Sequence, residues 1–202
     1  MTAGKPDESD YKQGVKHLKT LMTLSTLQHI DLYFADESGF SLLPQIPYGW
    51  LPKGKQTGIL SDSKRVMNVF GLMSLSQKLY TYPIKGTINS AFICQALDDF
   101  SKTIDLPTVV VLDQATWHTA ANIQNRIQEW QNQNLFLFFL PKYSPHLNAI
   151  EILWRNIKYR WLKPKDYLNE HTFHDALCNI FKNFGNLFQI NFSKNFYVLQ
   201  QS

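Results

Sequence analysis

The chain has 202 residues, 44% of them hydrophobic and 14% aromatic, which is enough apolar material for one folded domain and argues against disorder. Its formal net charge is +4, with a pI near 9.0, and this balance suits a polyanionic partner. The sequence contains no apolar run of about 18 residues or more, and no charged-then-apolar leader opens it. We therefore expect neither a membrane-spanning nor a secreted protein.

The first part of the chain is predicted to form one helix and then several strands. Apolar residues at helical spacing predict a short helix over residues 11–28. Period-two alternation predicts a strand that ends at Asp36, and Glu37, Ser38 and Gly39 then suggest a turn. Further strands are expected over residues 40–47, 65–74 and 78–82, the last two paired as a hairpin.

The second part alternates helices and apolar strands. A helix is expected over residues 89–103 with Asn89 as its N-cap, followed by a strand over 109–112 of the type buried on both faces. An amphipathic helix over 116–131 then leads to another buried strand over 135–140. Antiparallel strands thus come first and parallel strands later, which predicts a mixed α/β sheet with helices packed on it.

Three acids are embedded in these apolar blocks. Asp36 ends a strand, Asp113 follows four apolar residues, and Glu151 lies in the first turn of a predicted helix, with 76 and 37 residues between them. Carboxylates gathered from distant points of a chain suit Mg²⁺, which prefers oxygen ligands and keeps several waters. Two such ions about 3.5–4 Å apart support in-line attack on a phosphodiester. The acids therefore predict polynucleotidyl transfer.

Each acid also has a purely structural explanation. Aspartate at a strand end is commonly a turn former, and Asp113 can cap the helix that follows it. Asn148 and Glu151 have the spacing of a capping box. Because side chains alternate along a strand, Asp36 and Glu37 should face opposite ways, so only one of them can join a site. Three acids in separate, ordered blocks favour the shared site over three coincidences.

Basic residues gather near the first and third acids. Lys53 and Lys55 follow the first, whereas Lys142, Arg155 and Lys158 surround the third. A solvated surface is one explanation for such clusters. Their coincidence with the acidic blocks favours a rim that binds phosphates, and such contacts position DNA without reading its sequence.

The blocks resemble those of a known family. DLYFADESGF, VVVLDQATWH and above all LPKYSPHLNAIEILWRNIK are similar to the catalytic half of the insertion-sequence DDE transposases of the mariner superfamily, in the expected order from about Asp31 to Trp161. The sequence departs from the family pattern at Ala149, where proline is usual, and at Gln114, where asparagine is frequent. The residues of the third block that match are Pro141, Tyr143, Ser144, Asn148, Glu151, Trp154 and Lys158.

The resemblance implies a ribonuclease H-like fold with helices on both faces of the mixed sheet. This catalytic domain would cover residues 31–185, with residues 1–30 as a lead-in and 186–202 as a tail. The resemblance also implies that Asp36, Asp113 and Glu151 are the catalytic residues and hold two Mg²⁺ ions, for which Mn²⁺ can substitute. His118 would face the DNA, the alternative being a histidine satisfied in the first turn of a helix.

The activity implied is cleavage of DNA at the ends of a mobile element and strand transfer into a TA-containing target, by a homodimer on paired ends. About 30 residues before Asp31 are too few for the family's paired DNA-reading domains, so we expect a separate helix-turn-helix polypeptide to supply them. Two alternatives are open. One is a ribonuclease H-like nuclease without strand transfer, and the other is a decayed or domesticated transposase that binds DNA or dimerises without catalysis.

Overall fold

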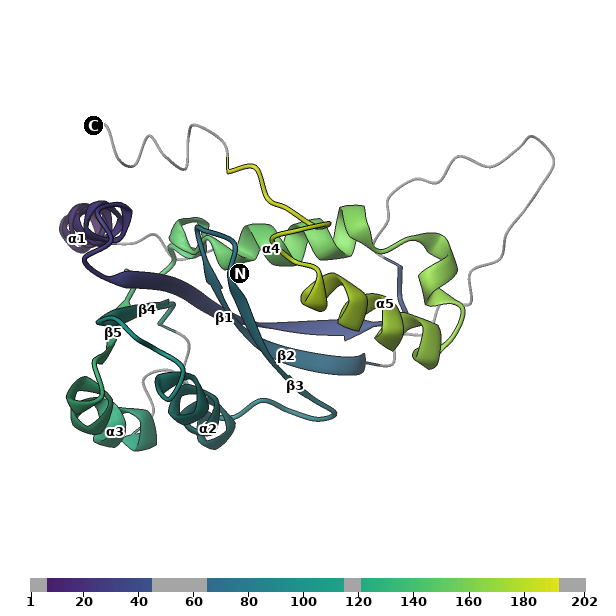
Figure 1. The fold of residues 1–202 in the computed structure, drawn as a ribbon, viewed down its shortest axis with the longest axis horizontal. Coiled ribbons are helices and arrows are strands. Elements are labelled where there is room, and N and C mark those ends of the chain that lie inside the picture. The colour runs from purple at the N-terminus through teal and green to yellow at the C-terminus, as the bar shows by residue number, and fades with distance from the viewer. Residues whose placement is uncertain (1–6, 45–64, 115–120, 193–202) are drawn as a thin grey trace.

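A five-stranded sheet with helices on both faces forms the centre of the molecule (Figure 1). The structure is a computed structural model, and it describes residues 7–44, 65–114 and 121–192. The strands are β1 (Asp31–Ser41), β2 (Arg65–Ser74), β3 (Leu79–Ile84), β4 (Thr108–Leu112) and β5 (Leu135–Phe139). The helices are α1 (Glu8–Thr26), α2 (Ser90–Ser101), α3 (Ala121–Asn132), α4 (Ile150–Asn156) and α5 (Glu170–Lys182). The shorter turns are η1 (Pro145–Leu147), the π-helical η2 (Ile157–Trp161) and η3 (Pro164–Tyr167).

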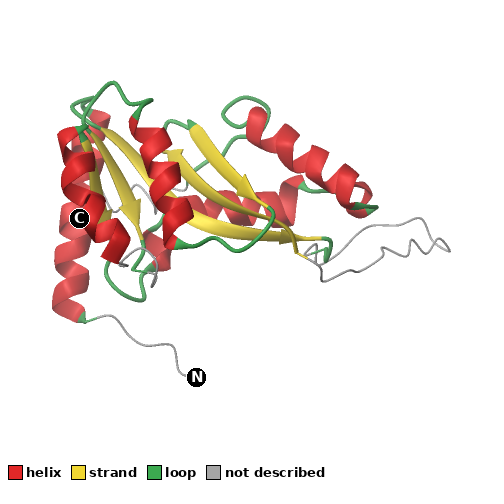
Figure 2. Ribbon diagram, turned by 90° about the horizontal axis from the view of Figure 1, so that it is seen from below, coloured by secondary structure: helices red, strands yellow, loops and turns green. Residues whose placement is uncertain are grey.

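The strand order is β3-β2-β1-β4-β5. The first three strands form an antiparallel meander, and β4 and β5 then add in parallel beyond β1. Seen from below, the sheet has a marked twist, with helices in front of it and behind it (Figure 2). The predicted mixed α/β sheet with helices on both faces is confirmed.

Strand β1 differs from the prediction in one way that matters for the site. The expected turn over residues 37–39 is wrong, because β1 continues without a break from Asp31 to Ser41. Glu37, Ser38 and Gly39 pair with Phe70, Val69 and Asn68 of β2, and this ladder overrides the local turn signal. Asp36 therefore lies in the middle of a strand rather than at its end.

Each face of the sheet carries its own apolar core. Helices α1, α4 and α5 cover one face, and α2 and α3 cover the other (Figure 1). Leu18 of α1, Trp154 of α4 and Phe173 of α5 belong to the first core, together with Phe34 of β1. The second core includes Phe100 of α2 and Trp130 of α3. Alternation along β1 assigns each of its residues to one face or the other.

One predicted helix cap and the predicted burial of two strands can be compared with the structure. Asn89 is the N-cap of α2, as expected, and its side chain accepts a hydrogen bond from the amide of Phe92 at 2.9 Å. Strand β4 is buried along its whole length, as expected, but β5 is an edge strand on which Phe136 is exposed. The prediction of a fully buried β5 is therefore wrong. Within the described ranges, no helix is both long and apolar enough to cross a membrane.

Candidate active site

The strand register brings the first two acids level with each other. In the parallel ladder between β1 and β4, Phe34 pairs with Val111. Asp36 lies two residues beyond Phe34, and Asp113 lies two residues beyond Val111. Because side chains alternate with a period of two, both acids point to the face that Phe34 and Val111 occupy, which is the face covered by α4. Glu151 comes from α4 itself.

The three acids are close enough to affect one another electrostatically. Asp36 is only 9% exposed, and burial raises the pKa of its carboxyl group from 3.8 to about 8, with further contributions from Glu37, Glu151 and Asp113. Burial also raises the pKa of Glu151, to which Asp113 adds, while Lys158 and Arg155 oppose the change. With a pKa of about 8, the Asp36 carboxyl group would hold its proton at neutral pH unless a cation replaced it.

One hydrogen bond orients the buried carboxylate. The indole Nε1 of Trp154 donates to Oδ2 of Asp36 at 3.2 Å, within the core. Gly71 is the partner of Asp36 on β2, and a Cβ at that position would lie 2.7 Å from the ring of Trp154. The absence of a side chain at Gly71 thus leaves the space in which the indole reaches the acid. The ring also packs edge-on against Phe40, with centroids 6.0 Å apart.

A second bond ties the chain before α4 to the same strand. The side-chain amide of Asn148 donates to the carbonyl of Ala35 at 3.0 Å. Asn148 is 2% exposed, and its Oδ1 has no hydrogen-bond partner among the described residues. The capping box, which was the alternative explanation for the spacing of Asn148 and Glu151, does not form, because the N-cap of α4 is Ala149 and makes no side-chain bond. Instead of capping the helix, Asn148 attaches the Glu151 segment to β1 beside Asp36.

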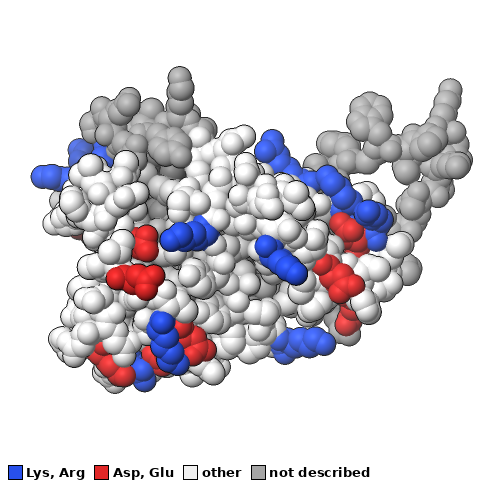
Figure 3. Space-filling model, in the orientation of Figure 1, with Lys and Arg blue, Asp and Glu red and all other residues white. Residues whose placement is uncertain are grey.

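Two of the predicted basic residues lie within electrostatic reach of Glu151. Lys158 and Arg155 both act on the Glu151 carboxyl group, and the ammonium of Lys158 also lies 5.4 Å from the ring centre of Phe40. In the orientation of Figure 1, basic side chains form a row along the upper right of the molecule, where the chain leaves α4 (Figure 3). The exposed basic residues of this segment are Arg155, Arg160, Lys163 and Lys165.

Of the other predicted DNA contacts, only one is among the described residues. Lys142 is exposed and lines a hollow with Asp113. Lys53, Lys55 and His118 lie outside the described residues. Sequence reasoning missed the bonds made by Asn148 and Trp154, although both residues belong to the most specific block. It also missed Gly71, for which no local signal exists, since its partner ring comes from a distant helix.

The donor set suits a hard divalent cation. Three carboxylates and an orphaned, buried amide oxygen next to β1 are oxygen donors of the kind that Mg²⁺ and Mn²⁺ take. Across the described part of the chain, however, three or more acidic, histidine or cysteine side chains do not meet in an arrangement that could hold a metal ion. The acids nevertheless lie within electrostatic reach of one another. Their carboxylate oxygens are chemically suited to hold a divalent cation.

Fold and acids together define a class of protein. An antiparallel meander followed by two parallel strands, with acids at the edge where β1 and β4 part, is a ribonuclease H-like domain. The chain belongs to the DDE superfamily endonuclease family, whose model matches residues 31–173.

The solved structures similar to this chain share its fold. They include the strand transfer complex of Mos1, with a TM-score of 0.54 and 13% identity over 90% of this chain and 61% of the Mos1 chain. The Mos1 transposase paired-end complex with the left transposon end has a TM-score of 0.54 and 15% identity, over 91% of this chain and 62% of that one. The Mos1 mariner paired-end complex with Mn gives 0.51 and 13%, over 91% and 66%.

A curated relative is similar over a shorter stretch. The uncharacterised protein y4pE/y4sA of Sinorhizobium fredii is 37% identical over 62 residues, which are 29% of this chain and 42% of the relative. The chain thus spans less than half of this relative and about three fifths of the first two Mos1 chains.

Proposed function

We propose that this chain is the catalytic domain of a transposase, which cleaves DNA at the ends of a mobile element and joins them to target DNA. Asp36, Asp113 and Glu151 would hold the divalent cations, Mg²⁺ or Mn²⁺, on which the chemistry depends. The observation that carries the proposal is the register of β1 and β4, which sets Asp36 level with Asp113 on the face covered by the helix of Glu151. Membership of the DDE superfamily endonuclease family supports the same reading.

The protein's own groups have separate tasks in this proposal. When bound, divalent cations activate the attacking oxygen of water or a DNA 3′-hydroxyl and stabilise the departing oxygen. Trp154 holds one oxygen of Asp36 in place, which leaves the other oxygen for a cation. Asn148 keeps the Glu151 segment against β1. Lys158 and Arg155, beside Glu151, offer positive charge to the DNA backbone.

The partners in this proposal are DNA and a second copy of the chain. The Mos1 structures of similar fold are paired-end and strand transfer complexes, which supports assembly of a dimer on DNA ends. A separate helix-turn-helix polypeptide that reads the end sequences remains part of the proposal.

The test uses DNA that carries the inverted repeats flanking the gene, with Mg²⁺ or Mn²⁺, and measures nicking and joining separately. Asp113→Asn removes the charge but keeps the size and capping ability of the residue, so folding should survive while both reactions fall by roughly 10³-fold or more. Asp105→Asn is the matched control, because Asp105 is an exposed acid in the loop before β4.

The possible outcomes separate the proposal from its alternatives. Full activity in a well-folded Asp113→Asn protein would place the metal site elsewhere. Metal-dependent nicking without joining would identify a nuclease. DNA binding by the unaltered chain without either reaction, with any helix-turn-helix partner supplied, would identify a non-catalytic binding protein.

A further inference from the structure

Tyr143 is an exposed aromatic residue in an unfavourable backbone conformation. It lies in the loop between β5 and η1, it is 62% exposed, and its φ of 58° is in the left-handed region. The other described non-glycine residues with positive φ are two glutamines and an asparagine. A bulky residue held at positive φ costs free energy, and such strain persists where the surroundings impose it and a function uses it.

The loop that carries Tyr143 is held on its flanks. Pro141 packs against α1 at Gly14, where no larger residue would fit beside the proline ring. On the other side, the hydroxyl of Tyr11 is hydrogen-bonded to Nε2 of His146 at 3.0 Å. Ser144, next to Tyr143, is only 3% exposed. The tyrosine ring therefore stands out from a loop that is anchored to α1 at both ends.

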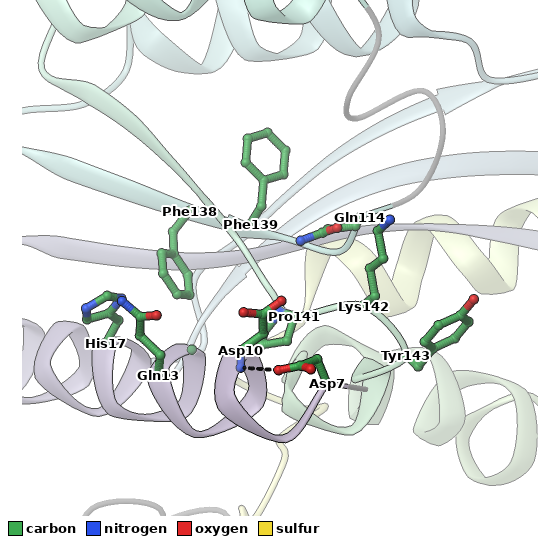
Figure 4. Close-up of a pocket in the computed structure, with 11 residues that line it drawn as sticks. Asp7, Asp10, Gln13, His17, Gln114, Phe138, Phe139, Pro141, Lys142 and Tyr143 are labelled. Carbon is green, nitrogen blue, oxygen red and sulfur yellow. Dashed lines mark hydrogen bonds between the residues drawn. The ribbon is translucent and has the colours of Figure 1, made fainter. Parts of the chain in front are cut away.

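The ring borders a hollow that also contains a proposed catalytic acid. The hollow has a volume of about 390 Å³ and is lined by Asp113, Gln114 and the residues of the segment 141–145, which include Lys142 and Tyr143. A neighbouring hollow of about 470 Å³ shares Gln114, Lys142 and Tyr143 and extends to α1. Figure 4 shows Lys142 and Gln114 side by side, with Tyr143 at the rim beyond them.

The charges of the two hollows differ in a way that suits one orientation of a nucleotide. Asp7 and Asp10 line only the larger hollow, which disfavours a phosphate there, whereas Lys142 lines both hollows and favours one. Gln114 offers an amide that can bond the edge of a base. A volume near the lower end of the ~300–1,000 Å³ range of small-ligand pockets suits one nucleotide rather than a duplex.

We propose that Tyr143 is a stacking platform for one unpaired base of the DNA strand that enters the site, with the adjoining phosphate beside Lys142. The inference rests on the proposed function, because it takes the strand at Asp113 to be DNA. Bases are sequence-tolerant partners for an aromatic ring, since each has a π-face, and a base taken out of its stack needs such a surface. A base on Tyr143 would fix the strand next to the acids.

The test measures binding of a single-stranded oligodeoxynucleotide that contains 2-aminopurine, whose fluorescence falls when the base stacks. Tyr143→Asn should weaken binding about 5- to 150-fold and abolish the quenching. The same variant should keep or raise Tm, because asparagine tolerates the left-handed conformation better than tyrosine does. Tyr143→Trp should preserve both binding and quenching, since it retains an aromatic face.

The control is Phe136→Thr, which removes an exposed aromatic ring from the opposite end of β5. It should leave binding and quenching unchanged. Unchanged binding and quenching in Tyr143→Asn would overturn the proposal, and so would a loss of binding explained by a lower Tm. If quenching depends on Tyr143 but no metal-dependent cleavage occurs, the platform stands and the proposed function fails. If cleavage depends on Asp113 but quenching does not depend on Tyr143, the proposed function stands and the platform fails.

Discussion

Asp36 and Asp113 each lie two residues beyond the paired positions Phe34 and Val111 of β1 and β4, but their surroundings are opposite in kind. Asp36 is buried in the middle of β1, paired across to Gly71 and bonded by Trp154. Asp113 follows the last residue of β4, is half-buried, and borders an open hollow. The core thus fixes one acid before any ligand arrives, whereas the other faces the space through which a substrate would enter.

The largest expected effect comes from removing the charge at the buried position. Asp36→Asn should lower metal-dependent DNA cleavage by roughly 10³-fold or more, because it removes one member of the proposed catalytic unit. In metal-free buffer it should instead raise Tm, since an amide avoids the cost of a buried carboxylate beside other acids. Cleavage assays and thermal unfolding of the same preparation measure both effects. A lower metal-free Tm would show that the acid stabilises the fold.

The same variant tests the pH dependence of stability. The folded chain holds the Asp36 proton up to a pKa of about 8, whereas the unfolded chain releases it near the ordinary value of 3.8. Between these values the folded state binds more protons, so the free energy of unfolding should fall as pH rises, and level off above about pH 8. Denaturant unfolding of the metal-free protein across this window should show the slope in the unaltered chain and a shallower one in Asp36→Asn. Equal slopes would contradict the assignment.

A smaller effect is expected from the indole that orients Asp36. Trp154→Phe keeps an aromatic ring beside Phe40 and Gly71 but removes the N–H donor. Groups that orient a metal ligand typically contribute about 10- to 100-fold in affinity, so Mn²⁺ binding measured by calorimetry should weaken by that factor. Trp161→Phe is the control, because Trp161 packs on Phe188 away from the acids. Equal Mn²⁺ affinity in both variants would mean that the indole only fills space.

The smallest effect is steric and acts on stability. Gly71→Ala places a methyl group against the ring of Trp154, and overpacking of this kind costs about 1–3 kcal/mol of unfolding free energy. Gly86→Ala is the matched control, because no atom lies within 4 Å of a Cβ at that position. Chemical denaturation of both variants gives the comparison. The atoms that the methyl group would meet first are Cη2 and Cζ2 of the indole's outer ring, which phenylalanine lacks, so adding Trp154→Phe to Gly71→Ala should recover much of the lost stability. No recovery would show that the cost of the methyl group does not come from the indole.

Most of the fold could be predicted because its signals are local. Apolar spacing gave the helices, and the order of strand types gave the mixed sheet. The two errors in the strands share a cause. Glu37 to Gly39 look like a turn until β2 pairs with them, and the apolar run of β5 looks buried until its place at the edge is known. Pairing partners decide both cases, and an isolated segment does not contain that information.

The site was predictable only as far as its chemistry could be read from residue types. Acids in three ordered blocks predict a shared cation site. The register of β1 and β4 brings two of these acids to the same end of the ladder. The bonds of Asn148 and Trp154 were not predictable, because each joins residues more than a hundred positions apart. Asn148 illustrates the difficulty, since its spacing to Glu151 fits a helix cap that does not form.

The distance of those two bonds along the chain has a consequence for synthesis. The bonds from Asn148 and Trp154 to β1 span 113 and 118 residues. As the chain emerges from the ribosome, β1 is therefore synthesised long before α4. Until α4 is made, Asp36 and one apolar face of β1 stay uncovered. Contacts of such long range are slow to form, and exposed strands invite wrong pairing meanwhile. Truncation before α4 should thus leave a nascent chain in need of a chaperone rather than a smaller folded domain.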